Sequence, residues 1–335
     1  MRISDVTSEV DFEAEGKRSG FLRVPHSVDR SAYGWLPVPI TVIRNGDGPT
    51  LLISAGVHGD EYEGQIAVGE LARDLASDEV RGRLILLPMT NAPASAAGRR
   101  VSPIDGGNLN RTYPGAAHGT PTQMIAHFHE EILLPLADYA VDLHSGGASL
   151  NYPATVMRGP SHSLEEEAGL TELIGAFDLP YAWVFTGGGG PTSTARTAMG
   201  AANRKGVINL MAELGGGGVV NQEVLALTRR GLRRILHALG MLPGYQLDAP
   251  RGTRALNSKG IVHAPIAGQF EPLKEIGEPV AYGELVALLH HPDTPWEAPV
   301  QVTSPFAGIV LAMRAMAPSQ RGDALFQIAD DAPNT

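Results

Sequence analysis

The sequence predicts an α/β fold, with a sheet flanked by helices, followed by a second domain made only of β-strands. Between residues 40 and 240, short apolar runs alternate with amphipathic stretches, which is the pattern of a layered α/β domain. Beyond residue 246 the helical periodicity ends, and short strands punctuated by Gly and Pro continue. A length of 335 residues also fits two domains of roughly 150 residues each. We therefore place the domains at 1–246 and 247–335.

The elements of the first domain follow from the spacing of apolar residues. A helix is predicted after residue 61, because Val68, Leu71 and Leu75 recur at helical spacing. The last helix of this domain covers 221–242, with leucines on one face and arginines largely on the other, and it ends before Pro243. The strands are expected at 40–44, 51–57, 84–89, 140–144, 154–158, 183–186 and 207–214.

The second domain contains a weak internal repeat. The segment HAPIAG at 263–268 corresponds to TSPFAG at 303–308, and each is followed by a β run. Two such halves resemble the barrel-sandwich of biotinyl and lipoyl domains. No Lys lies in 313–317, where a carrier domain would present its modified residue. We therefore expect this domain to be structural or to shape the mouth of a site.

Composition narrows the function. A formal net charge of −10 repels phosphate backbones and anionic membranes, so the expected partner is a small molecule rather than nucleic acid or a membrane. The chain has no Cys, so any metal must be held by His and carboxylates. Residues 1–17 lack an apolar stretch and no later window reaches ~18 apolar residues, so the chain is expected to be cytoplasmic. Assembly into a homo-oligomer stays open.

Two strand ends carry potential metal ligands. The run 51–57 leads directly into His58-Gly-Asp-Glu61, and the run 140–143 leads into His144. Sites of open α/β sheets lie at the carboxyl ends of strands, and two His with one Glu form a catalytic rather than a structural zinc set. The alternatives are a helix-capping Glu61 and an ordinary strand-end histidine at position 144. The pattern favours one Zn²⁺ per chain at His58, Glu61 and His144.

Other charged residues indicate where an anion would bind and react. The loop RVSPIDGGNLNRTYPG at 100–115 is rich in Gly and Pro, and its Arg100 and Arg111 are suited to carboxylate recognition. Glu213 stands near the end of an apolar strand, where a carboxylate is costly unless it is catalytic or paired. Arg196 follows a glycine run and is a candidate substrate contact.

Taken together and in order, HGDE, RVSPIDGGNLNRTYPG, DLHSGG and AELGGGG resemble the succinylglutamate desuccinylase and aspartoacylase family of zinc amidohydrolases, relatives of the zinc carboxypeptidases. The resemblance covers nearly the whole chain. It implies a zinc-exopeptidase-like mixed sheet and zinc ligands at His58, Glu61 and His144. It also implies a carbonyl-polarising Arg100, a general base at Glu213, and carboxylate binding by two loop residues, Asn110 and Arg111.

One residue departs from the family pattern. Aspartoacylases usually carry Asp-Leu-Asn-Arg where this chain has Asn108-Leu109-Asn110-Arg111, so a carboxylate that would orient a zinc histidine is missing. Either Asp105 or Asp142 is a candidate replacement.

The implied reaction is hydrolysis of the amide of an N-acyl amino acid. Its rivals are a zinc carboxypeptidase acting on peptides and a metal-dependent binding protein without turnover. A cationic substrate side chain is expected to meet an acidic residue, whereas an acidic side chain needs an additional Arg or Lys.

Overall fold

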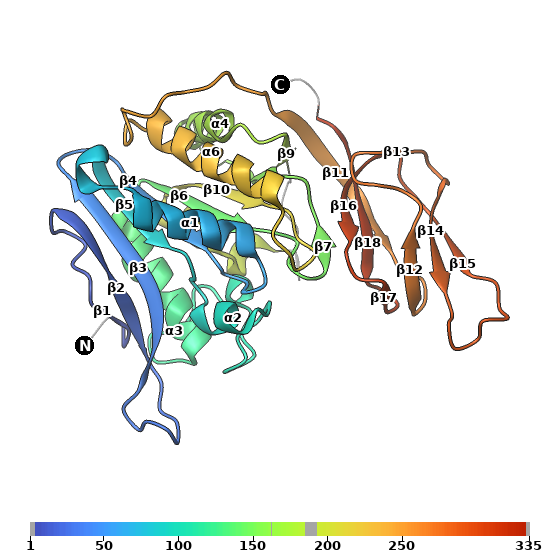
Figure 1. Ribbon diagram of the computed structural model, residues 1–335, viewed down its shortest axis with the longest axis horizontal. Coiled ribbons are helices and arrows are strands. Elements are labelled where there is room, and N and C mark those ends of the chain that lie inside the picture. The colour runs from blue at the N-terminus through green and yellow to red at the C-terminus, as the bar shows by residue number, and fades with distance from the viewer. Residues whose placement is uncertain (1–3, 162, 185–192, 333–335) are drawn as a thin grey trace.

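The computed structural model describes residues 4–161, 163–184 and 193–332. Its main element is a 14-stranded mixed sheet, in the order β1-β2-β3-β5-β4-β6-β10-β8-β9-β11-β18-β16-β13, with β7 beside β16 (Figure 1). The mixed α/β prediction is therefore confirmed. The strands before the C-terminal part are β1 Thr7–Ser8, β2 Gly16–Pro25, β3 Trp35–Asn45, β4 Thr50–Ala55, β5 Gly82–Leu87, β6 Tyr139–His144, β7 Leu150–Asn151, β8 Thr155–Arg158, β9 Tyr181–Val184 and β10 Ile208–Glu213.

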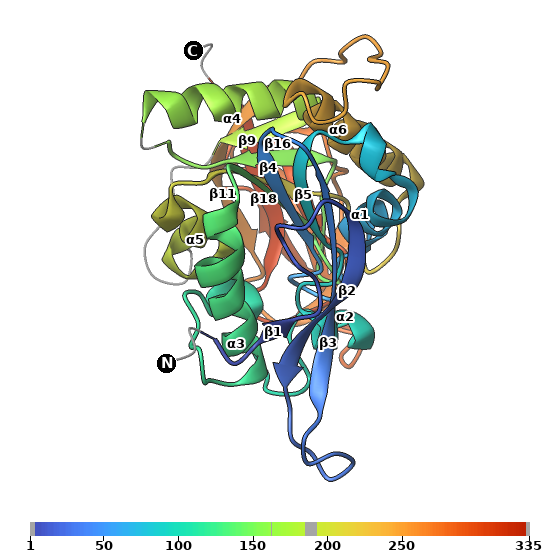
Figure 2. The ribbon, with the colours of Figure 1, turned by 90° about the vertical axis from the view of Figure 1, so that its left-hand side faces the viewer.

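Helices cover both faces of this sheet, as its apolar central strands require. Figure 2 shows α1, α4 and α6 on one face and α3 and α5 on the other. In β4, Leu51 and Ile53 pack into the cluster beneath α1, whereas Leu52 points into the cluster on the opposite face. The helices are α1 Tyr62–Asp74, α2 Ala92–Ala97, α3 Pro121–Phe128, α4 Leu164–Phe177, α5 Ala198–Lys205 and α6 Gln222–Ala238.

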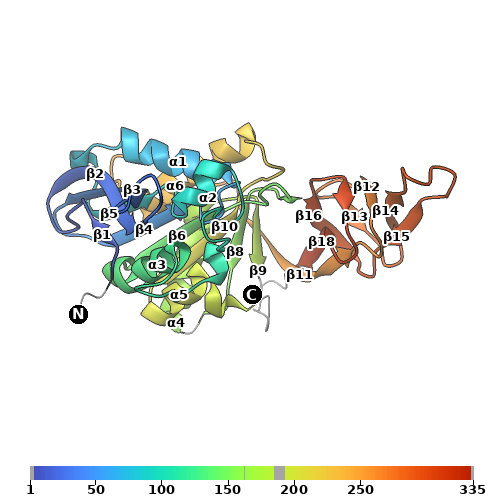
Figure 3. The same ribbon diagram turned by 90° about the horizontal axis from the view of Figure 1, so that it is seen from below.

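Several of the C-terminal strands belong to the main sheet. Strand β11 (Arg254–His263) pairs parallel with β9 and antiparallel with β18 (Ala324–Asp331). Beyond them, β12, β14, β15 and β17 form a separate antiparallel sheet that extends away from the helices (Figure 3). The remaining strands are β12 Gly268–Pro272, β13 Pro279–Val280, β14 Leu285–His290, β15 Val300–Thr303, β16 Gly308–Arg314 and β17 Pro318–Ser319.

The internal repeat has a structural counterpart. The segments 263–268 and 303–308 each connect two strands and end at the glycine that begins the next strand, β12 or β16. Within the described ranges, no helix is both long and apolar enough to cross a bilayer.

Candidate active site

The three predicted metal ligands stand at the carboxyl ends of neighbouring parallel strands. Strands β4 and β6 pair in parallel up to Ala55 and Leu143, so the residues after them emerge at one edge. His144 is the last residue of β6, and Glu61 directly precedes α1. The turn between β4 and α1 needs small residues. A Cβ on Gly59 would lie 2.0 Å from the backbone of Ala94.

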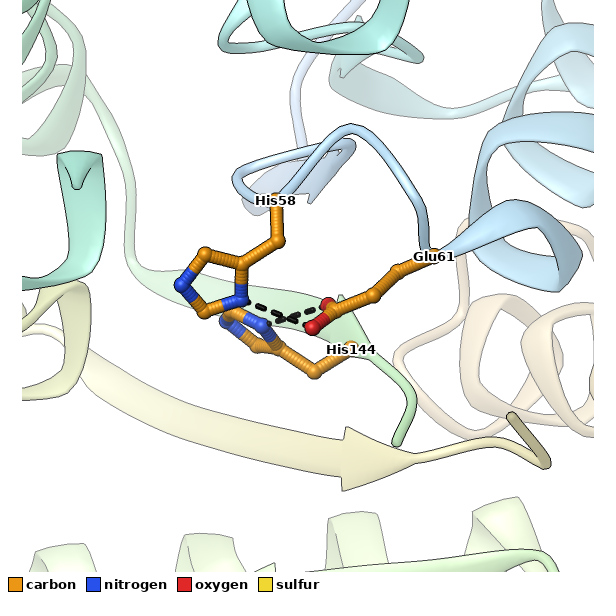
Figure 4. A group of neighbouring side chains, drawn as sticks. All are labelled: His58, Glu61 and His144. Carbon is orange, nitrogen blue, oxygen red and sulfur yellow. Dashed lines mark hydrogen bonds and ion pairs between the residues drawn. The ribbon is translucent and has the colours of Figure 1, made fainter. Parts of the chain in front are cut away.

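The ligand atoms of these residues converge. The Nδ1 of His58 lies 2.7 Å from Glu61 Oε1, and the Nδ1 of His144 lies 2.9 Å from Glu61 Oε2 (Figure 4). One potential ligand atom from each of the three residues lies within 4.8 Å of the other two. Each residue is at most 3% exposed. Two imidazoles and a carboxylate thus form a buried cluster that could hold a metal ion.

Each histidine is oriented through its other ring nitrogen. The Nε2 of His58 lies 3.1 Å from the amide oxygen of Asn108, and the Nε2 of His144 lies 2.9 Å from Asp142 Oδ2. Both acceptors need a proton on Nε2, which leaves Nδ1 of a neutral ring with a lone pair facing Glu61. Two lone pairs at this distance repel unless a proton or a cation lies between them. The donor set therefore fits a bound divalent cation.

Of the two candidate replacement carboxylates, only Asp142 contacts a predicted zinc-ligand histidine. Asp142 orients His144, and its other oxygen accepts a hydrogen bond from Ser54. Asp105 instead accepts from the backbone and hydroxyl of Thr122 and does not reach a histidine. His58 therefore has a neutral amide where His144 has a carboxylate.

Glu213 is the last residue of β10, and it lies next to His144 in the parallel pairing of β10 with β6. Burial, together with the neighbouring charge of Glu61, raises the pKa of Glu213 to about 8. Its Oε2 is buried and has no hydrogen-bond partner among the described residues. A carboxyl group in this setting is suited to gain and lose a proton near neutral pH.

The glycines after Glu213 let two loops touch. Gly215 to Gly218 all have positive φ, and a Cβ on Gly216 would lie 2.1 Å from the carbonyl oxygen of Leu150. The carbonyl of Gly215 accepts hydrogen bonds from the amides of Gly146 and Tyr152. The loops after His144 and after Glu213 are thereby fastened to each other.

These residues open into one cavity of about 930 Å³. It is lined by His58, Glu61, His144 and Glu213, and by the predicted Arg100, Asn110 and Arg111. Arg100 is half-exposed, with Nη1 3.4 Å from Glu61 Oε1. Asn110 is buried, and its Oδ1 accepts from the amide of Ala198 at the start of α5.

Arg196, the predicted substrate contact, is not among the residues that line the cavity. The 3₁₀ turn Thr194–Arg196 directs Arg196 to solvent, whereas Ser193, Thr194 and Thr197 line the cavity.

The sequence reasoning missed the remaining walls of the cavity. One wall is apolar, with Met157, Met199 and Met211 packed around Trp183. Another comes from the C-terminal strands and includes Asn257, Ser258, Ile261 and Gln327. Gln327 gave the same signal as Glu213, because it is a polar residue within the apolar run LFQIA at 325–329.

The cavity has few side-chain cations. Among its described lining residues the cations are Arg100 and Arg111, and the carboxylates are Glu61 and Glu213. A substrate with one carboxylate therefore finds cationic partners here. A second carboxylate would have no side-chain cation of its own on the described walls.

The chain matches a known family and is similar to a characterised protein over nearly its whole length. Residues 47–239 match the model of the succinylglutamate desuccinylase/aspartoacylase catalytic domain. The chain is 36% identical to the N-alpha-acetyl-L-2,4-diaminobutyric acid deacetylase of Halomonas elongata, over 98% of this chain and 96% of that protein.

Solved structures of similar proteins cover the whole fold. The product-bound ectoine utilization protein EutE (DoeB) of Ruegeria pomeroyi has a TM-score of 0.93 and 36% identity. A succinylglutamate desuccinylase/aspartoacylase of Rhodobacter sphaeroides has a TM-score of 0.91 and 36% identity. Each match covers 98% of this chain and 100% of the other. The C-terminal strands are therefore included in the similarity.

Proposed function

Because this chain belongs to the succinylglutamate desuccinylase/aspartoacylase family, we propose that it is a zinc-dependent enzyme that hydrolyses the amide of an N-acyl amino acid. The observation that carries the proposal is the convergence of His58, Glu61 and His144 beside Glu213 at the base of one cavity.

The three-residue cluster would hold the metal. Two imidazole nitrogens and one carboxylate leave a coordination position open to water or substrate, which is typical of catalytic zinc sites. A Zn²⁺ bound there supplies a Lewis acid that lowers the pKa of water and polarises a carbonyl. Other divalent ions accept the same ligands, so zinc is the specific part of this proposal.

Glu213 would handle the proton. Its carboxylate takes a proton from the attacking water as oxygen adds to the acyl carbon, and it then delivers that proton to the leaving amine nitrogen. The C–N bond breaks, giving a carboxylic acid and a free amino acid. The buried and unpartnered Oε2 of Glu213 supports this role, because a carboxylate oxygen is poorly placed there unless a substrate or water meets it.

The arginines would position and stabilise the substrate. Arg100 lies beside Glu61, where its guanidinium can stabilise the negative oxygen of the tetrahedral intermediate. Arg111 and Asn110 would hold the α-carboxylate, so that binding energy orients the amide for attack. No hydrogen bond from the side-chain nitrogen of Asn110 is found among the described residues, which leaves this donor available for the contact.

We propose N-α-acetyl-L-2,4-diaminobutyrate as the substrate, with diaminobutyrate and acetate as the products. Similarity to the Halomonas elongata deacetylase over nearly the whole of both chains supports this choice. The small number of cations on the described walls also favours it over N-acetylaspartate or N-succinylglutamate. A second substrate carboxylate would find only Arg100 and Arg111, which already have roles, on the described walls.

The family relation also supports a division of labour within the fold. We propose that residues 1–246 form a zinc-exopeptidase-like catalytic domain and that 247–335 form a barrel-sandwich-like domain. Strands β11 and β18 stand along one side of the cavity, which favours a small acyl amino acid over the long peptides of a carboxypeptidase.

The test is a comparison of kcat/KM for zinc-loaded protein on N-α-acetyl-2,4-diaminobutyrate, N-acetylaspartate and N-succinylglutamate. We expect the first to be preferred by about 100-fold, or about 2.7 kcal/mol of transition-state binding. Preference for an acidic derivative would keep the hydrolase and reject this substrate. Absence of turnover on all three would favour a binding protein.

A further inference from the structure

The side chain of Gln327 reaches the cavity from the C-terminal part of the chain. It lies on β18 opposite Ile261 of β11, and directly paired residues of antiparallel strands point to the same face. Both residues line the cavity, whereas the neighbouring pair Val262 and Phe326 packs into the core of the C-terminal strands.

Gln327 is buried and only partly satisfied. Its side chain belongs to a residue that is 7% exposed. Its Oε1 accepts a hydrogen bond from the hydroxyl of Tyr152, at 3.1 Å. Its Nε2 has no hydrogen-bond partner among the described residues. A carbonyl oxygen has two lone pairs, so Oε1 can accept from one further donor.

Tyr152 ties this amide to the reacting end of the cavity. Burial, with Glu213 nearby, raises the pKa of the Tyr152 hydroxyl, which therefore stays a neutral donor. The backbone of Tyr152 bonds to Gly215, in the loop that follows Glu213. Gln327 is thus connected, through Tyr152 and Gly215, to the loop that follows the proposed general base Glu213.

The ammonium at the end of the proposed substrate's side chain still needs a hydrogen-bond partner. In the proposed binding mode the substrate carboxylate lies at Arg111 and Asn110 and the acyl group at Arg100 and Glu213. The side chain would then face the remaining walls. The methionine and tryptophan wall suits methylene groups but offers no acceptor of comparable strength. Among the polar residues of the C-terminal wall, Gln327 is the most deeply buried.

We propose that Gln327 is a specificity residue, whose amide oxygen accepts a hydrogen bond from the terminal ammonium of the substrate side chain, with Tyr152 as its positioning residue. The inference rests on the proposed deacetylase function. A neutral acceptor recognises the cation without adding a third carboxylate beside Glu61 and Glu213, where like charges would raise the cost of ionisation. In this proposal the ammonium of the substrate is bound by the amide of Gln327, and not by the acidic residue expected from the sequence.

The test compares two substrates that differ only in the ammonium, N-α-acetyl-2,4-diaminobutyrate and N-acetyl-2-aminobutyrate. The ratio of their kcat/KM values cancels any effect of a variant on the chemical step or on folding. In Gln327→Ala we expect this ratio to fall by about tenfold or more, as for loss of a hydrogen bond to a charged group. Tyr152→Phe should lower it by about threefold.

Two further variants sharpen the result. Gln327→Glu keeps an acceptor of the same shape and should hold the ratio at or above the wild-type value. Gln301→Ala removes an exposed glutamine from β15, away from the cavity, and should leave the ratio unchanged.

Several outcomes would overturn the inference. These are an unchanged ratio in Gln327→Ala, a ratio near one in the wild type, or a loss in Gln327→Glu as large as in Gln327→Ala. If both substrates are hydrolysed and one of these three outcomes is found, only the role of Gln327 is rejected and the proposed hydrolase function stands. If the wild type hydrolysed neither substrate, the proposed function would fail first and this inference with it.

Discussion

The imidazole of His58 donates a hydrogen bond from Nε2 to the side-chain oxygen of Asn108, 3.1 Å away. The equivalent nitrogen of His144 faces the carboxylate of Asp142 at 2.9 Å. A carboxylate acceptor fixes the ring and makes its other nitrogen a stronger metal ligand, and a neutral amide does so less. The two histidines are therefore unequal ligands.

We predict that Asn108→Asp tightens zinc binding by about tenfold, because partners of metal ligands typically change affinity by about 10-fold to 100-fold. Asp142→Asn should weaken it by a similar factor, since it gives His144 the environment that His58 now has. Competition with a chelator at neutral pH measures both dissociation constants without any assay of activity. Equal affinities in all three proteins would show that these acceptors do not tune the site.

Glu213→Gln is expected to reduce kcat by about 100-fold to 10,000-fold, the usual contribution of a general acid–base. Zinc affinity should change little, because Glu213 is not one of the three converging ligands. The exposed Glu223→Gln on α6 is the matched control and should keep full activity. Turnover by Glu213→Gln at the wild-type rate would assign the proton to another group.

The strands that carry the site were predictable because each combines an apolar run with a polar residue at its end. The runs at 51–57, 140–144 and 207–214 overlap β4, β6 and β10, and the family motifs follow them. The run at 183–186 overlaps β9 through Val184, and residues 185–186 lie outside the described ranges. Local sequence suffices where burial on both faces makes a strand apolar throughout.

Two features depended on pairings that local sequence does not encode. Strand β2 (Gly16–Pro25) has no continuous apolar run, and it joins the sheet through its antiparallel register with β3. Gln327 reaches the cavity because β11 pairs with both β9 and β18. Likewise, the choice between Asp105 and Asp142 depended on ring orientation, which appears only in three dimensions.

Asp105 provides a test by pH. Burial alone would raise the pKa of Asp105. Hydrogen bonds from the amide and hydroxyl of Thr122 outweigh this effect and hold the pKa at about 2. This value is below that of an unfolded chain, so the stabilisation is full above pH 4 and disappears as pH falls towards 2. Asp105→Asn should therefore lower the free energy of unfolding by about 1 kcal/mol at neutral pH, a figure reduced for partial exposure.

The measurement is urea unfolding of both proteins in chelator at pH 7, 4 and 3, so that metal release does not contribute. The difference between wild type and Asp105→Asn should shrink steadily as the pH falls. A difference that is constant, or that grows in acid, would mean that the charge of Asp105 does not stabilise the loop carrying Arg100 and Arg111.

Two helical glycines, Gly231 and Gly175, have opposite surroundings. A Cβ on Gly231 of α6 would lie 2.1 Å from the ring of Phe177, whereas a Cβ on Gly175 of α4 would meet nothing within 4 Å. Gly231→Ala should therefore destabilise the fold by about 1–3 kcal/mol through overpacking. Gly175→Ala should stabilise it by about 0.5–1 kcal/mol, the usual gain from replacing glycine within a helix.

Both variants should retain the wild-type kcat/KM, because neither glycine lines the cavity. Chemical denaturation of the zinc-loaded proteins gives the two changes in unfolding free energy, and a substrate assay on the same samples checks the site. If Gly231→Ala were as stable as Gly175→Ala, the close contact between α6 and Phe177 would be wrong.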